Sequence, residues 1–135
     1  MQQHNSVYSL GTSTRSRAEF TVLLQSHGIE MVIDVRRFPT SRIEHFKQEA
    51  LKQLLYDLHI DYLHLGDKLG GYRSGGYKAF TTTNEFEQGV RAIEETASQK
   101  RSAILCAERL PWRCHRRFIT AELEKKGWQD RKSVV

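Results

Sequence analysis

The chain has 135 residues, 39% of them hydrophobic, and we expect a single domain over residues 1–135 around one core. Lysine and arginine (21) outnumber aspartate and glutamate (16), so the formal charge is +5 and the surface should attract anions. No apolar run approaches the roughly 20 residues that cross a bilayer, which excludes a transmembrane protein. Residues 1–6 are polar, unlike a signal peptide, so we expect a cytoplasmic protein that does not bind membranes.

The N-terminal part of the chain predicts a strand, a loop and a helix. Residues 6–10 are apolar enough for a buried strand, and turn-forming residues follow at 11–15. Ser16 and Glu19 have the spacing of a capping box, which marks the start of a helix. Gly28 stands where a left-handed residue would end that helix.

The same alternation continues through the middle of the chain. Residues 31–35 predict a second buried strand that leads into a basic loop at 36–42. An apolar helix face follows over 50–58, and 61–65 predicts a third strand. The glycine-rich stretch 66–82 predicts a long irregular loop, which is usually functional or mobile.

The last third of the chain adds two more helix and strand pairs. An apolar stripe over 86–97 predicts a helix, and 102–106 predicts the fourth strand. Pro111 suits the first turn of a helix that ends at Gly127, and residues 128–135 predict a fifth strand. Strands that alternate with helices indicate an α/β protein. We expect a three-layer α/β/α, Rossmann-like architecture with a mainly parallel sheet of four or five strands.

Arginines gather at the expected strand ends, where ligands of open parallel sheets bind. Lysines such as Lys47 and Lys52 fall on expected helix surfaces instead. Because the planar guanidinium matches phosphate or carboxylate, we predict an anion site; ordinary surface charge paired with Asp34 and Glu108 is the alternative. The candidate anion-binding residues are Ser13, Arg15, Arg36, Arg37, Arg42, Arg109, Arg113 and Arg116.

The two cysteines, Cys106 and Cys114, are too few for a disulfide scaffold, so we expect free thiols or metal ligands. Cys106 ends a strand before a loop and a helix N-terminus, a placement that lowers a thiol pKa and favours a reactive thiolate. Cysteine phosphatases and rhodanese-like sulfur transferases have a similar arrangement. The spacing in the cysteine phosphatases, however, requires an arginine at the position where this chain has Trp112. The alternative is that Cys106 is a buried structural residue.

His115 is the nearest candidate general acid or base, and His64 at the end of the third strand competes with it. Asp34 either orients a base or pairs with Arg36, and we expect the pairing. A metal site would combine Cys106 with Cys114 and His115, which are neighbours in the sequence. Structural zinc normally takes four ligands in close pairs, so we predict no metal ligand set here.

Four motifs together resemble the domain-of-unknown-function 488 family of small prokaryotic proteins, which has no assigned reaction. They are residues 8–16, residues 34–39 with 41–42, residues 69–71 and the segment Cys-Ala-Glu-Arg-Leu-Pro-Trp-Arg-Cys-His-Arg at 106–116. The resemblance implies a three-layer α/β fold with a polar site built from these motifs. Its implied members are Ser13, Asp34, Arg36, Arg37, Cys106, Glu108, Arg109, Cys114, His115 and Arg116.

The first motif departs from the family at Thr12, where histidine is usual. A base or metal ligand at that position would be lost here, although a threonine hydroxyl can still donate to a phosphate or orient a water. We take Thr12 as a supporting residue of the site. The other supporting residues are Asp34, Gly70, Gly71 and Cys114.

Three functions remain open from the sequence. The first is an enzyme on a phosphate-bearing substrate, a nucleotide or nucleic acid, with Cys106, His115 and Glu108 as catalytic residues. The second is a noncatalytic binder of the same ligands, in which Tyr72 and Tyr77 would stack on bases. The third is a Cys/His metal-binding protein. The sequence specifies no cofactor and no oligomeric state.

Overall fold

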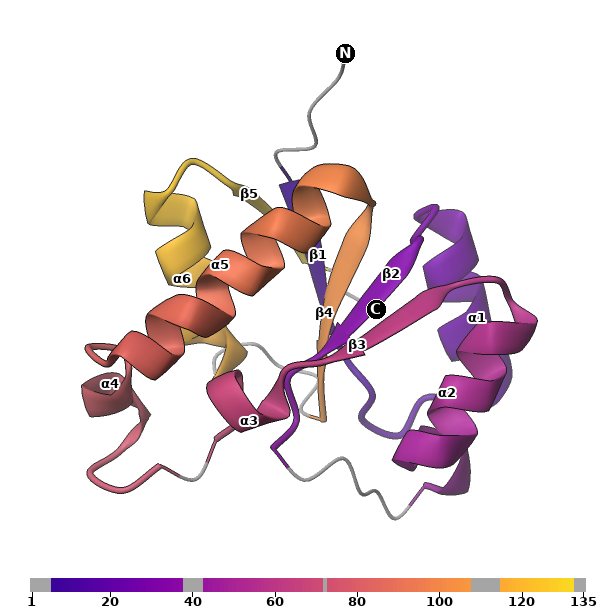
Figure 1. Cartoon of the computed structure of the whole chain (residues 1–135). Coiled ribbons are helices and arrows are strands. Elements are labelled where there is room, and N and C mark those ends of the chain that lie inside the picture. Colours follow the sequence, from indigo (N-terminus) through magenta and orange to yellow (C-terminus); the bar gives the residue numbers. More distant parts are fainter. Residues whose placement is uncertain (1–5, 38–42, 72, 108–114, 133–135) are drawn as a thin grey trace.

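Five strands form one sheet between two layers of helices (Figure 1). The structure is a computed structural model that describes residues 6–37, 43–71, 73–107 and 115–132. The strands lie in the order β3-β2-β4-β1-β5, and every neighbouring pair is parallel. The strands are β1 (Ser6–Gly11), β2 (Met31–Asp34), β3 (Asp61–His64), β4 (Ser102–Cys106) and β5 (Gln129–Lys132). The helical elements are α1 (Arg17–Ser26), η1 (Glu44–Phe46), α2 (Gln48–Asp57), α3 (Gly66–Leu69), α4 (Tyr77–Phe80), α5 (Asn84–Gln99) and α6 (Arg116–Lys125).

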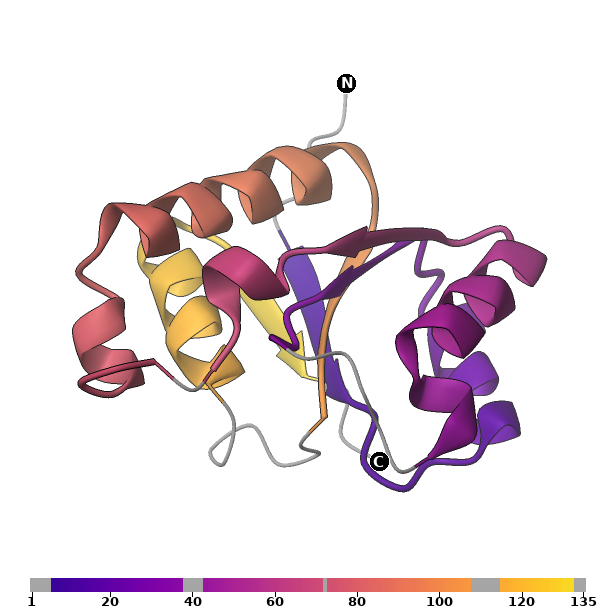
Figure 2. The ribbon, with the colours of Figure 1, turned by 60° about the horizontal axis from the view of Figure 1, so that its bottom comes forward.

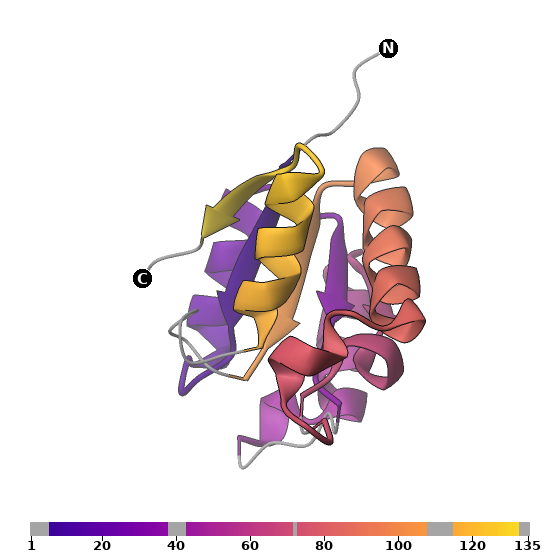
Figure 3. The same cartoon turned by 90° about the vertical axis from the view of Figure 1, so that its left-hand side faces the viewer.

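The predicted α/β/α class is therefore confirmed, with five strands in the sheet. Because side chains alternate along a strand, each strand supplies both faces of the sheet. In β4, Ala103 and Leu105 pack with α1 and α2, whereas Ile104 and Cys106 pack with α3, α5 and α6. Figure 3 views the layers from the β5 edge. No helix among the described residues is long and apolar enough to cross a membrane.

The predicted start and end of α1 are both confirmed. Ser16 accepts from the Glu19 amide while the Glu19 carboxylate accepts from the Ser16 amide, which completes the capping box. After the helix, Gly28 has a φ of 64°, the left-handed conformation that ends helices with little strain at glycine.

The stretch 66–82 differs from its prediction as an irregular loop, because it contains α3 and α4. Each spans four residues, which is too short for an apolar repeat to be recognised in the sequence. The short helix η1 was likewise not predicted. The predicted helix start at Pro111 lies outside the described residues, and α6 is described from Arg116 onward.

The chain leaves the sheet in opposite directions from two neighbouring strands. After β1 it enters α1 on one face, and after β4 it enters α6 on the other face. Figure 2 brings the carboxyl ends of the strands forward. Open α/β sheets bind ligands where the chain reverses in this way at adjacent strands. The candidate ligand site is therefore at the carboxyl ends of β1 and β4 and of the neighbouring β2.

Candidate functional site

Backbone hydrogen bonds continue the strand pairing beyond the carboxyl ends of β1 and β4. The Thr12 amide donates to the Cys106 carbonyl and the Ser13 amide to the Ala107 carbonyl, both at 2.8 Å. Within the loop, the Arg15 amide donates to the Thr12 carbonyl at 3.1 Å. These three amides are therefore engaged within the protein and do not donate to an anion.

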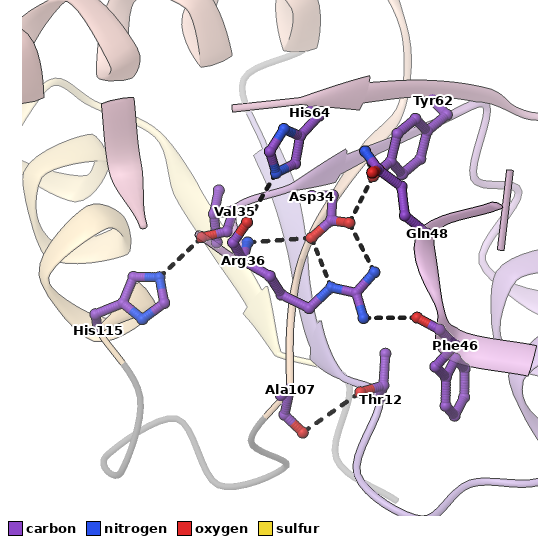
Figure 4. Close-up of polar contacts among 10 residues, drawn as sticks. All are labelled: Thr12, Asp34, Val35, Arg36, Phe46, Gln48, Tyr62, His64, Ala107 and His115. Atoms are coloured by element: carbon purple, nitrogen blue, oxygen red, sulfur yellow. Dashed lines mark hydrogen bonds and ion pairs between the residues drawn. The ribbon is translucent and has the colours of Figure 1, made fainter. Parts of the chain in front are cut away.

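The loop that carries these amides is tightly folded. Ser13 has a φ of 46°, a left-handed conformation that is uncommon for residues other than glycine. Thr12 is 2% exposed, and its hydroxyl lies 3.5 Å from the Ala107 carbonyl oxygen (Figure 4). At the end of the loop, the Arg15 Nε donates to the Gly11 carbonyl at 3.0 Å. The predicted β1 motif thus forms one compact turn against the end of β4.

Asp34 and Arg36 form a buried ion pair at the end of β2. Arg36 Nη2 donates to Asp34 Oδ2 at 2.8 Å, and Arg36 Nε donates to Oδ1 at 2.9 Å. The Asp34 side chain is fully buried, and Arg36 Nη1 donates to the Phe46 carbonyl at 2.7 Å (Figure 4). Breaking a buried pair by removing one partner typically costs about 3–5 kcal/mol. The expected pairing is therefore present, and Arg36 is committed to protein groups rather than open to a ligand.

Tyr62 completes the environment of Asp34 from β3. Its hydroxyl donates to Asp34 Oδ2 at 2.7 Å and lies 3.3 Å from the Gln48 side-chain nitrogen. Burial raises the pKa of the Tyr62 phenol well above its usual value, and the negative charge of Asp34 acts in the same direction. The phenol consequently stays protonated and remains a hydrogen-bond donor to the carboxylate.

His115 and His64 donate to successive carbonyl groups after β2. His115 Nε2 lies 3.1 Å from the Val35 carbonyl oxygen, and His64 Nε2 lies 2.8 Å from the Arg36 carbonyl oxygen (Figure 4). Since a carbonyl only accepts, the neutral His115 ring carries its proton on Nε2 and its lone pair on Nδ1. Burial lowers the pKa of His115, and the positive charges of Arg116 and Arg73 lower it further. The ring is therefore neutral near pH 7 and able to accept a proton.

Gly71 lies between His115 and Arg37. A methyl group on Gly71 would lie 3.3 Å from His115 Nδ1, and the Gly71 carbonyl lies 3.4 Å from Arg37 Nη1. The neighbouring Gly70 approaches the backbone so closely that a Cβ there would lie 2.5 Å from Arg37 Cα. His115 and Arg37 thus both lie against the predicted supporting glycines Gly70 and Gly71.

Cys106 ends β4 with 1% exposure and packs among apolar side chains beneath α5 and α6. Its sulfur is disulfide-bonded, which corrects the expectation of a free thiol. Cys106 is buried because β4 is the central strand and helices cover both faces of the sheet; alternation along β4 places this side chain on the face of α5 and α6. A role as nucleophile therefore requires prior reduction.

The described members of the predicted site lie at or after the carboxyl ends of β1, β2, β3 and β4. They are Thr12, Ser13, Arg15, Asp34, Arg36, Arg37, Gly70, Gly71, Cys106, His115 and Arg116. Five predicted members lie outside the described residues, and these are Arg42, Glu108, Arg109, Arg113 and Cys114. Sequence reasoning missed Gln48 and Tyr62, and also His45, whose Nε2 lies 2.9 Å from the Arg15 carbonyl oxygen. No motif marks these residues, since their partners are distant in the chain.

The described residues contain no group of three or more histidine, cysteine, aspartate or glutamate side chains that could hold a metal ion. Within this described part, the site is built from hydrogen-bonded arginines, a neutral histidine and a buried carboxylate instead.

The fold and the site define a Rossmann-like α/β protein whose polar residues gather at the carboxyl ends of a parallel sheet. The family model described as "Domain of unknown function DUF488" matches residues 16–76 and 73–123. The chain belongs to the DUF488 family, as its motifs indicated. No curated protein matches the sequence.

Proposed function

We propose that this protein is an enzyme that acts on a phosphate-bearing substrate, a nucleotide or nucleic acid, at the ends of β1, β2 and β4. The observation that carries the proposal is the meeting of His115 and Arg37 at Gly71. His115 is neutral, with its lone pair on Nδ1, so it serves as a general base. Arg37 supplies a half-buried guanidinium for the phosphate.

Cys106 is the nucleophile of this proposal once its disulfide has been reduced by a dithiol, which gives up two electrons and two protons. The Cys106 thiol then passes its proton to His115, and its sulfur forms a bond to phosphorus. The phosphorus–oxygen bond to the leaving group breaks, and that oxygen receives the proton from His115. Water next attacks phosphorus and gives its proton to His115, and the sulfur leaves as the thiolate.

The test is turnover of nucleoside triphosphates and of a short single-stranded oligonucleotide, with and without dithiothreitol. We expect products only from reduced protein and none from C106S. His115→Gln keeps a donor for the Val35 carbonyl but removes the base, and a loss of about 10²- to 10⁴-fold is expected. Lys52→Ala, an exposed change on α2, is the matched control. Equal turnover by oxidised and reduced protein would refute the role of Cys106.

Noncatalytic binding of the same ligands is the second candidate. It is favoured by the burial and the disulfide of Cys106, because binding by arginines needs no thiol. In this case oxidised protein, reduced protein and C106S bind an oligonucleotide equally and none releases product. Affinity should fall steeply as salt rises, since each neutralised phosphate releases counterions.

A further inference from the structure

The short helix η1 is hydrogen-bonded to the ends of two strands of the site. On one side, the Phe46 carbonyl of η1 accepts from Arg36 Nη1 at 2.7 Å. On the other side, His45 Nε2 donates to the Arg15 carbonyl at 2.9 Å. The Phe46 ring is fully buried and packs edge-on against Phe20 of α1 at 5.0 Å. Thus η1 connects the end of β2 to the loop after β1.

The contacts that join η1 to the end of β2 are made by buried groups. Asp34 holds the Arg36 guanidinium through Nε and Nη2, which leaves Nη1 directed at the Phe46 carbonyl. Asp34, Arg36 and Phe46 are 0%, 5% and 0% exposed. A bidentate pair fixes the plane of the guanidinium, so the position of η1 follows from that of the ion pair.

The loop on the other side has a conformation that its neighbours must hold in place. Ser13 is left-handed, and such residues persist only where surrounding contacts determine the backbone. Arg15 bonds within the loop through its Nε and its amide, whereas its carbonyl accepts from His45. The His45 ring, 4.3 Å from the Phe46 ring, is itself oriented by the buried anchor of η1.

We propose that His45 is a positioning residue, which holds the Arg15 loop in place, and that Arg36 is its anchor rather than a phosphate ligand. This inference rests on the proposed function only where it concerns phosphate binding near the loop that carries Arg15. The placement of the loop itself rests on hydrogen bonds that exist without a ligand. His45 thereby acts on the substrate through the position of this loop and not by contact.

The first experiment is hydrogen exchange of the Thr12 and Ser13 amides, followed by NMR in three variants. His45→Ala removes the donor, His45→Gln returns an N–H at the position of Nε2, and Glu44→Ala alters the exposed side of the same turn. We expect exchange to accelerate about three- to tenfold in H45A, on the scale of one lost hydrogen bond, and to return to normal in H45Q. Exchange in H45A equal to that in E44A would overturn the proposal.

The second experiment measures the affinity for a fluorescent single-stranded 12-nucleotide DNA at several salt concentrations. We expect H45A to bind about three- to tenfold more weakly with an unchanged salt slope, because no phosphate contact is lost. Arg37→Ala should instead lower the magnitude of the slope by about 0.7. A reduced slope in H45A would show direct contact and overturn the positioning role. If wild type binds no DNA while H45A still accelerates exchange, the positioning role stands and the proposed action on nucleic acid fails.

Discussion

Asp34 accepts hydrogen bonds from the amide, Nε and Nη2 of Arg36 and from the Tyr62 hydroxyl. Because the carboxylate is fully buried, each of these bonds replaces one that water would otherwise make. The Arg36 bonds could be expected from the sequence, since the two residues lie two positions apart at a strand end. The Tyr62 bond could not, because it joins residues 28 positions apart through the pairing of β2 with β3.

Tyr62→Phe should measure the contribution of that hydroxyl. The phenyl ring keeps the packing, but the carboxylate loses one donor, and a hydrogen bond to a charged group contributes about 1.5–3 kcal/mol. We expect the free energy of unfolding in urea at pH 7 to fall by about this amount. Tyr56→Phe, on an exposed ring of α2, is the control and should change stability by less than about 0.5 kcal/mol. Equal effects would mean that the Asp34 bond contributes nothing.

At the scale of elements, the short helix α3 is held against the end of β2 by two close backbone approaches. Gly66 packs on the Arg36 carbonyl, and Gly70 packs on the backbone of Arg37. Gly70 belongs to the sequence motif at 69–71, and Gly66 only to the glycine-rich stretch 66–82. The reason for both glycines is steric, and it depends on the packing of α3 against the end of β2. The capping box of α1 was predictable because all its members lie within four residues.

Gly70→Ala tests this close approach. Its Cβ would lie 2.5 Å from both Arg37 Cα and the Gly66 carbonyl oxygen, so the backbone must shift. Overpacking of this kind costs about 1–3 kcal/mol, which a urea unfolding curve detects. Gly71→Ala is the matched control, since its Cβ would lie 3.3 Å from a side-chain atom, His115 Nδ1. We expect G71A to lose less stability than G70A; the reverse order would contradict the steric explanation.

For the whole molecule, the alternation of strands and helices predicted a parallel sheet between helical layers, and the structure has this architecture. The strand order β3-β2-β4-β1-β5 was not available from the sequence, because it depends on which distant strands pair. That order decides the site. It sets β4 between β1 and β2, and so brings the start of α6, with His115, to the Val35 carbonyl at the end of β2.

The same arrangement makes the stability of the whole protein depend on pH. Burial lowers the pKa of His115 below its ordinary value of about 6.5, so at mildly acidic pH the unfolded chain binds a proton that the folded chain does not. The free energy of unfolding is therefore highest above pH 6.5 and decreases as the pH falls below it. The decrease is at most about 1.4 kcal/mol per pH unit for one proton.

His115→Gln keeps a donor for the Val35 carbonyl but does not titrate. Urea unfolding between pH 7.5 and pH 5.0 should thus show a steeper loss for wild type than for H115Q, and an NMR titration of the His115 ring should give a pKa below 6.5. Parallel stability curves for the two proteins would mean that His115 titrates alike in the folded and unfolded chains, which would contradict the lowering of its pKa by burial.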